Sequence, residues 1–233
     1  MPFHPSLELS SPQVQAIPVA DCEEPLLDAT HSGVITCGPP SECPETAPFY
    51  RLLRSGVVAR LEQAQQYLPA GLRLRVYEGY RYPKIQQMLF DAQWRRMQIA
   101  HPTQSAAWCY AQAAQLASPL RTFAGEPMIP PHSTGGAVDI DIVDAAGQPL
   151  DFGMALSDWG EVPPELCATQ YAGLTDVAAR NRQLLLEVMT AAGLVNYPRE
   201  WWHFSYGDRY WAYVTGSAQA RYGAVEESIF DAE

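Results

Sequence analysis

Proline is concentrated in the first 45 residues and limits the secondary structure that this part of the chain can form. A proline fixes φ and lacks a backbone N–H, so closely spaced prolines interrupt both helices and strands. We therefore predict that residues 1–45 form an extended arm packed on the body, and that residues 46–233 form one structural unit. The prolines of the arm are Pro2, Pro5, Pro12, Pro18, Pro25, Pro39, Pro40 and Pro44.

After the arm, the spacing of hydrophobic residues changes between the periods of helix and strand. Apolar residues recur every three or four positions over 46–68, which predicts an amphipathic helix ended by Pro69. Alternation over 72–80 predicts a half-buried strand. Two further helices are predicted over 84–100 and 103–117, the second with Thr103 as its N-cap.

The second half of the chain mixes strands with one long helix. Residues 135–152 are predicted to form a strand, a turn and a short return strand, and 177–194 a helix. The aromatic residues of 202–213 predict a hairpin-like pair of strands. This order indicates an α+β single domain with a small antiparallel sheet flanked by helices.

Composition restricts the partners and the cellular location. The net charge of −11 opposes binding to nucleic acid or to an anionic membrane, and a small substrate fits this charge better. The chain begins without a signal-peptide pattern and has no long apolar run, so we expect a cytoplasmic protein, or a periplasmic one if an export signal was removed. Its scattered cysteines are expected to be reduced thiols: Cys22, Cys37, Cys43, Cys109 and Cys167.

Two short segments carry residues that could bind a metal. His132 precedes a glycine-rich turn, and Asp139 follows in the next predicted strand. With His203 they would supply two imidazoles and one carboxylate and leave the fourth position of a tetrahedral zinc site for water. Glu200, three residues before His203, could take a proton from that water and return it to the leaving amine.

Each segment also has an interpretation without catalysis. A histidine in an aromatic strand can be a packed core residue, and Glu200 could form a surface ion pair with Arg199. The 132–139 segment could be only a tight turn. Asp141 and Asp144 compete with Asp139 for the ligand role, and Asp141 shares the strand face of Asp139.

The motifs together resemble a known family. "HSTGGAVD" resembles the SxHxxGxAxD signature of the VanX-type D-alanyl-D-alanine dipeptidases and related zinc D,D-carboxypeptidases of peptidase family M15. "EWWH" resembles their ExxH segment, "EGYRYP" their YRP stretch, and "IPVADCEEPLLD" their amino-terminal arm. The similarity extends from about residue 17 to about residue 215, and it implies a hedgehog and D,D-peptidase-like fold in which 46–233 is the catalytic domain.

The resemblance also implies a role for each matched residue. It implies one zinc ion per chain on His132, Asp139 and His203, with Glu200 as general base and then acid. Arg81 would steady the oxyanion of the tetrahedral intermediate, although an arginine at a strand end can also simply pair with a surface acid. Asp158 would hold the substrate amine, with Asp151 as its rival.

Two positions depart from the family pattern. Pro130 replaces the first serine of the signature, and Ser133 is a possible substitute for a substrate contact. Tyr82 separates Arg81 from Pro83 and could shift the guanidinium. Neither change removes a predicted metal ligand.

We therefore expect a zinc dipeptidase that cuts D-Ala-D-Ala or a similar short D,D-dipeptide. A first alternative is a D,D-carboxypeptidase acting on peptidoglycan fragments. A second is a zinc-binding module of the same fold without turnover, which the presence of Glu200 and Arg81 disfavours. The oligomeric state has no signal in the sequence.

Overall fold

The computed structural model describes residues 8–39 and 44–225 and has an α+β architecture around one five-stranded sheet. The strand order is β2-β4-β5-β7-β6, and all neighbours are antiparallel except the parallel pair of β2 and β4. A separate antiparallel pair joins β1 to β3. The strands are β1 (Leu26–Asp28), β2 (Thr36–Cys37), β3 (Leu52–Arg54), β4 (Arg73–Glu78), β5 (Ala137–Val143), β6 (Val195–Asn196) and β7 (His203–Ser205).

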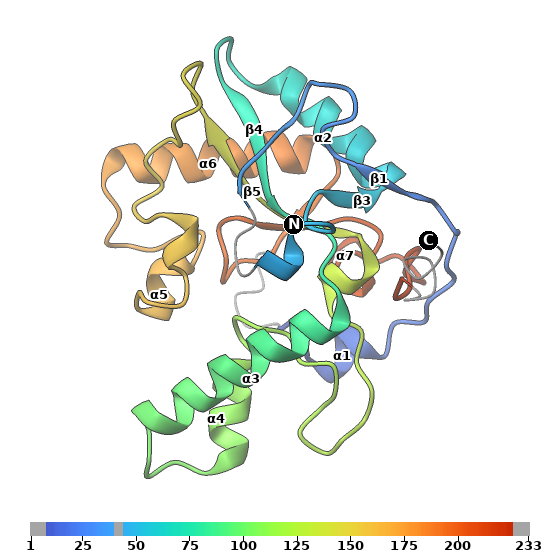
Figure 1. Cartoon of the computed structure of the whole chain (residues 1–233), viewed down its shortest axis with the longest axis vertical. Helices are drawn as coiled ribbons and strands as arrows, with labels where there is room; N and C mark the ends of the chain where they lie inside the picture. Colours follow the sequence, from blue (N-terminus) through green and yellow to red (C-terminus); the bar gives the residue numbers. More distant parts are fainter. Residues whose placement is uncertain (1–7, 40–43, 226–233) are drawn as a thin grey trace.

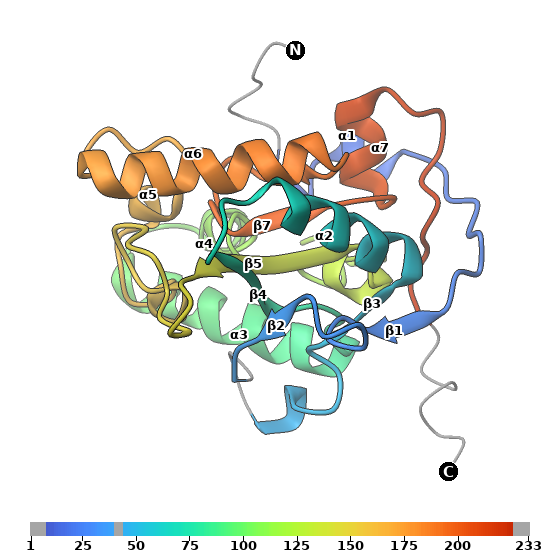
Figure 2. The ribbon, with the colours of Figure 1, turned by 90° about the horizontal axis from the view of Figure 1, so that it is seen from above.

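Helices α2 and α6 lie over one face of the sheet and build the main core with it, while α3 and α4 form a hairpin away from that layer (Figures 1 and 2). The hairpin has a small core of its own around Phe90 and Ala113. The helices are α1 (Pro12–Gln15), α2 (Ser55–Tyr67), α3 (Pro83–Ala100), α4 (Ala106–Ala113), α5 (Pro164–Cys167), α6 (Asp176–Ala191) and α7 (Arg209–Thr215).

Strand β5 separates the hydrophobic core from the polar side of the sheet. Val138, Ile140 and Ile142 are fully buried in the core that α2 and α6 cover. Because side chains alternate along a strand, Asp139 and Asp141 lie on the opposite face. The polar face of β5 is therefore available for a site without breaking the core.

A β-bulge in β4 brings another acid to the polar face. Val76 pairs with Ile140 and Glu78 pairs with Asp139, so Tyr77 is an extra residue between the two pairs. The extra residue reverses the alternation, and Glu78 thus lies directly across from Asp139. The strand predicted over 72–80 is confirmed, but its hydrophobic pattern gives no sign of this bulge.

Two glycines let the turn before β5 pack tightly. Gly135 ends the 3-10 turn Pro131–Thr134 with φ of 68°, a left-handed conformation that favours glycine. A Cβ on Gly136 would lie 2.7 Å from the carbonyl oxygen of Tyr206. The turn is thus shaped to hold His132 close to β7.

Three predicted element boundaries are wrong for local reasons. The helix predicted over 46–68 begins only at Ser55, because Leu52–Arg54 pair with β1 as strand β3. Thr103 is not the N-cap of α4, since the Ser105 side chain accepts the hydrogen bond from the Trp108 N–H. The return strand after β5 is reduced to an isolated bridge between Val143 and Pro149.

The predicted aromatic hairpin is also wrong in its second half. Residues His203–Ser205 form β7, but Arg209–Thr215 form helix α7. The Asp208 side chain caps this helix by accepting from the Trp211 N–H, and Gly216 ends it at φ of 72°. These capping signals prevail over the β-propensity of the aromatic residues.

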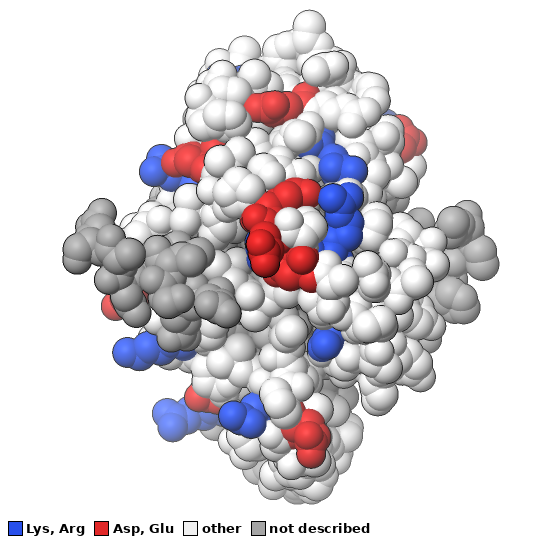
Figure 3. Space-filling model, turned by 90° about the vertical axis from the view of Figure 1, so that its right-hand side faces the viewer, with Lys and Arg blue, Asp and Glu red and all other residues white. Residues whose placement is uncertain are grey.

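The described part of the predicted arm, residues 8–39 and 44–45, is bonded to the body at several points. Its strands β1 and β2 pair with β3 and β4. Asp21 and Glu24 form ion pairs with Arg54 and Arg221 at 2.9 and 3.0 Å. Figure 3 shows acidic and basic side chains gathered side by side on one face. The division of the chain at residue 45 stays a prediction.

Cys22, Cys37, Cys109 and Cys167 are free, as expected, while Cys43 lies outside the described residues. None of the helices in the described ranges is long and apolar enough to span a membrane.

Candidate metal centre and active site

His132, Asp139 and His203 meet on the polar face of the sheet, and all three are buried. Asp139 on β5 pairs in register with His203 on β7, so their side chains are cross-strand neighbours. The turn that contains Gly135 and Gly136 places His132 beside Asp139 and His203. Its Nδ1 lies 2.8 Å from the carbonyl oxygen of Gly79, which fixes the orientation of the ring.

The three ligand atoms converge on one position. His132 Nε2 lies 3.2 Å from His203 Nδ1, and both lie close to Asp139 Oδ1, at 3.3 and 3.1 Å. Two imidazole nitrogens and one carboxylate oxygen at such spacing are donors directed at a common cation. The predicted His/Asp/His set is therefore assembled, and it forms a candidate metal site.

The surroundings of Asp139 keep its carboxylate ionised. Burial alone would raise the pKa of Asp139, but the adjacent His132 and His203 lower it below its usual value. An ionised buried carboxylate is a strong ligand for a cation.

Glu200 lies beside the cluster in the turn between β6 and β7. It is buried, and its Oε2 lies 3.6 Å from His203 Nδ1. Arg199 instead pairs with Glu8 at 2.5 Å, so the interpretation of residues 199 and 200 as a surface ion pair is wrong. The side chain of Glu200 faces the cavity that contains the cluster.

Arg81 reaches the cluster from the end of β4. Its Nη2 lies 3.8 Å from Asp139 Oδ2, and its Nε lies 3.6 Å from Glu78 Oε1. Tyr82, the residue inserted before Pro83, stacks on Phe49 with ring centroids 5.7 Å apart. The insertion is accommodated by this stacking, and the guanidinium stays beside Asp139.

The competing aspartates lie elsewhere. Asp141 is bound by both Nε and Nη2 of Arg75, at 3.0 and 2.5 Å. Asp144 is half-buried and accepts hydrogen bonds from the N–H groups of Ala146 and Gln148. Of the three candidates, only Asp139 belongs to the cluster.

The predicted substrate contacts are not brought into the cavity. Asp158 is exposed and accepts a hydrogen bond from Ser157 Oγ at 2.9 Å. Asp151 is also exposed and accepts from the Gly153 N–H. Ser133 is buried, but its hydroxyl donates to the carbonyl oxygen of Arg81 rather than facing the cavity. Their roles in substrate binding stay predictions.

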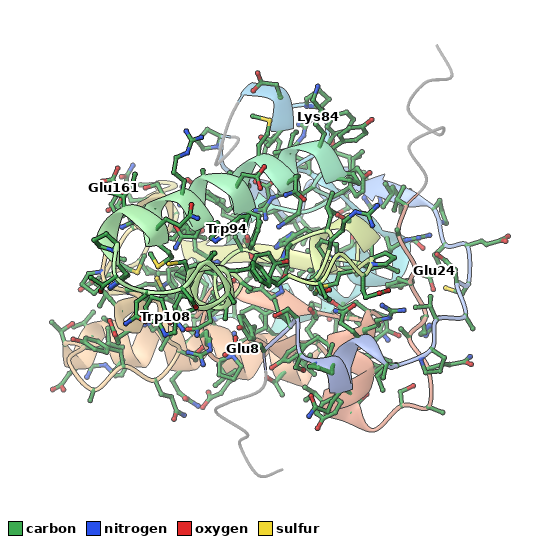
Figure 4. All side chains as sticks on the ribbon, turned by 90° about the horizontal axis from the view of Figure 1, so that it is seen from below. Glu8, Glu24, Lys84, Trp94, Trp108 and Glu161 are labelled. Carbon is green, nitrogen blue, oxygen red and sulfur yellow. The ribbon has the colours of Figure 1, made fainter. Side chains whose placement is uncertain are left out.

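A narrow cavity of about 30 Å³ contains the cluster. Several of the residues that line it were not predicted from the sequence. Leu9 comes from the arm, Gln86 from α3 and Ser118 from the loop after α4. Figure 4 views the hairpin side, with Trp94 and Trp108 on the hairpin and Glu8 on the arm. Glu78, which contacts Arg81 and does not line the cavity, belongs to the "EGYRYP" motif. Gln86 and Ser118 belong to none.

A buried set of metal-ligating side chains beside a carboxylate and an arginine is the arrangement of a metallopeptidase. The model of the M15 peptidase family, described as D-Ala-D-Ala dipeptidase, matches residues 50–221. The chain belongs to this family. The family and the cluster together indicate a metal ion at this site.

Two curated relatives share this description. A D-alanyl-D-alanine dipeptidase of Synechocystis is 31% identical over 241 residues, covering 91% of this chain and 96% of its own. A D-alanyl-D-alanine dipeptidase of Escherichia coli K12 is 27% identical over 135 residues, covering 58% of this chain and 55% of its own. The solved LdcB LD-carboxypeptidase, whose structure is described as revealing the basis of peptidoglycan recognition, aligns with a TM-score of 0.42 and 16% identity, over 83% of this chain and 73% of that chain.

Proposed function

We propose that this chain is a zinc-dependent dipeptidase that hydrolyses D-alanyl-D-alanine, or a similar short D,D-dipeptide, to free D-amino acids. The observation that carries the proposal is the convergence of His132, Asp139 and His203 beside Glu200. The substrate class is taken from the family and from the named relatives.

The spacing of the three donors suits one zinc ion per chain. Ligand atoms at about 2.0 to 2.1 Å from a tetrahedral zinc ion lie about 3.3 to 3.4 Å from one another. The three donor pairs lie 3.1 to 3.3 Å apart, close to this value. When bound, zinc supplies Lewis acidity, which polarises a carbonyl and makes water more acidic.

Glu200 and Arg81 provide the remaining chemistry. Glu200 takes the proton of the attacking water on a carboxylate oxygen and then delivers it to the leaving amine. Arg81 places positive charge where the carbonyl oxygen becomes negative, in a buried site where such an interaction is strong. A metal held only for structure would need neither group, so these residues disfavour the alternative of a binding module without turnover.

The family and the named relatives favour a dipeptide over a longer peptide, because both curated relatives are described as D-alanyl-D-alanine dipeptidases. The alternative of a D,D-carboxypeptidase on peptidoglycan fragments is tested by the peptide panel below. Asp158 remains the candidate for the substrate amine, because Leu156 and Trp159 on either side of it line the cavity.

A panel of peptides tests this function. The zinc-loaded protein would be incubated with D-Ala-D-Ala, L-Ala-L-Ala, D-Ala-L-Ala and a tripeptide ending in D-Ala-D-Ala, with chiral separation of the products. We expect D-alanine from the D,D-dipeptide and little product from the others. Faster release of terminal D-alanine from the tripeptide would favour the carboxypeptidase, and no hydrolysis of any peptide would refute the proposal.

A further inference from the structure

Gln86, near the start of α3, connects Arg81 to the loop after α4. Its Oε1 accepts a hydrogen bond from Arg81 Nη1 at 3.1 Å, and its Nε2 donates to the carbonyl oxygen of Ser118 at 2.7 Å. The side chain is only 1% exposed. A buried amide that satisfies a donor and an acceptor on two different segments fixes both in place.

Ser118 lines the cavity and has a buried hydroxyl without a hydrogen-bond partner among the described residues. The residue is 8% exposed. A buried polar group without a partner costs free energy, so a hydrogen-bonding ligand at this position would be favoured. Its backbone carbonyl oxygen already accepts a hydrogen bond from Gln86, whereas its hydroxyl has no partner in the described part of the chain.

We propose that Ser118 binds the substrate through its hydroxyl and that Gln86 is a positioning residue that holds both Ser118 and Arg81. This inference rests on the proposed dipeptidase function. The Ser118 hydroxyl donates a hydrogen bond to an oxygen atom of the dipeptide. Oxygen acceptors are the most numerous polar atoms of such a substrate. Helix α3 and the loop after α4 thereby contribute Gln86 and Ser118 to the substrate side of the cavity.

The neutral amide of Gln86 suits this position. Arg81 already faces two carboxylates, Glu78 at 3.6 Å and Asp139 at 3.8 Å. A third carboxylate would reduce the positive charge available to a developing oxyanion, whereas an amide oxygen orients the guanidinium without neutralising it.

The Ser118 contact is tested by binding in the absence of turnover. Zinc-loaded Glu200→Gln protein, with and without Ser118→Ala, would be titrated with D-Ala-D-Ala by calorimetry. Loss of one hydrogen bond is expected to raise Kd about threefold to tenfold. In the otherwise unchanged enzyme, Ser118→Ala should raise KM by a similar factor and change kcat by less than about twofold.

The role of Gln86 is tested by Gln86→Met, which keeps the length of the side chain and removes its hydrogen bonds. We expect kcat to fall about tenfold or more at unchanged zinc content, because a small displacement of a charge-stabilising group is costly. The matched control is Gln93→Met, another buried glutamine of α3 that does not line the cavity. Ser118→Ala removes a single oxygen atom and still tests the proposal if Gln86→Met does not fold.

The outcomes separate the two levels of the proposal. If Glu200→Gln protein binds the dipeptide and Ser118→Ala changes neither Kd nor KM, the substrate contact is refuted and the dipeptidase function stands. A kcat of Gln86→Met equal to that of Gln93→Met refutes the positioning role. If the unaltered zinc-loaded protein neither binds nor cleaves the dipeptide, the function and the inference fail together.

Discussion

Two aspartates on the same face of β5 have different partners, and this difference decides which of them can bind a metal. Asp139 faces two histidines, whereas Asp141 faces the Arg75 guanidinium across the β4 pairing. The sequence spacing predicts a shared face but cannot predict the partners, because the register of β4 on β5 is set by the whole sheet.

Their amide variants should therefore behave differently. Asp139→Asn is expected to lose tightly bound zinc, since a neutral amide is a poor ligand for this ion. Asp141→Asn should keep the metal and lower the free energy of unfolding by about 1 kcal/mol, because Arg75 loses its charged partner but stays partly exposed to solvent. Zinc content by atomic absorption and urea unfolding measure both effects. Loss of zinc from Asp141→Asn alone would reverse the assignment.

Asp208, the N-cap of α7, makes stability depend on pH. Burial raises the pKa of Asp208 to about 6, although the hydrogen bond from the Trp211 N–H opposes the shift. The folded state therefore holds this proton more tightly than the unfolded state does. The contribution of Asp208 to the free energy of unfolding is therefore fully present below about pH 4. It is lost as the pH rises through about 6.

We expect Asp208→Asn to remove this pH dependence, because an amide oxygen can still cap α7 and does not ionise. The difference between the unfolding free energies at pH 4 and pH 7.5 should change by about 2 kcal/mol relative to the unaltered protein. Urea titrations at both pH values measure it. An unchanged difference would show that the carboxyl titrates alike in the folded and unfolded states.

At the scale of secondary structure, the sequence predicts the long periodic elements and misses the short ones. The helices over 84–100 and 177–194 and the strand over 72–80 are confirmed within a few residues, because apolar residues recur in each at the period of its secondary structure. The short strand β3 exists only through pairing with β1, which local periodicity does not encode. Likewise, the motifs identify the His/Asp/His set of the candidate metal site. Gln86 and Ser118 belong to no motif, and only the tertiary packing of α3 and the loop after α4 places them at the cavity.

The cap of α4 offers a test at this scale. Ser105→Ala removes the side chain that accepts from the Trp108 N–H at 3.1 Å, so we expect a loss of about 1 kcal/mol. Thr103→Ala, two residues earlier, should change stability by much less. Urea unfolding of both variants, with hydrogen exchange of the α4 amides, compares them. Equal losses would contradict the assignment of Ser105 as the cap.

At the scale of the whole molecule, the arm contacts both the cavity and distant parts of the body. Leu9 lines the cavity, and Glu8 contacts Tyr197 Oη at 2.6 Å and Arg199 Nη2 at 2.5 Å, next to Glu200. Further along, Ala20 and Cys22 bond to the backbone of residues 220 and 221. Residues far apart in sequence thus close one side of the cavity.

Removal of residues 1–10 should therefore separate metal binding from catalysis. The truncated protein keeps all three proposed ligands, so we expect normal zinc content. Its KM for D-Ala-D-Ala should rise several-fold, because the cavity loses the wall formed by Leu9. Kinetics and metal analysis of the truncated protein measure these quantities. An unchanged KM would show that the arm does not shape the substrate site.

The most direct test of the account is the rate of D-alanine release by Glu200→Gln, compared with the unaltered protein at equal zinc content. Glu200 has no place among the proposed ligands, so the variant should bind one zinc ion per chain. Its kcat should fall by about a hundredfold or more, because it cannot accept the proton of the attacking water. Equal rates at equal zinc content would contradict a general base at Glu200 and the mechanism built on it.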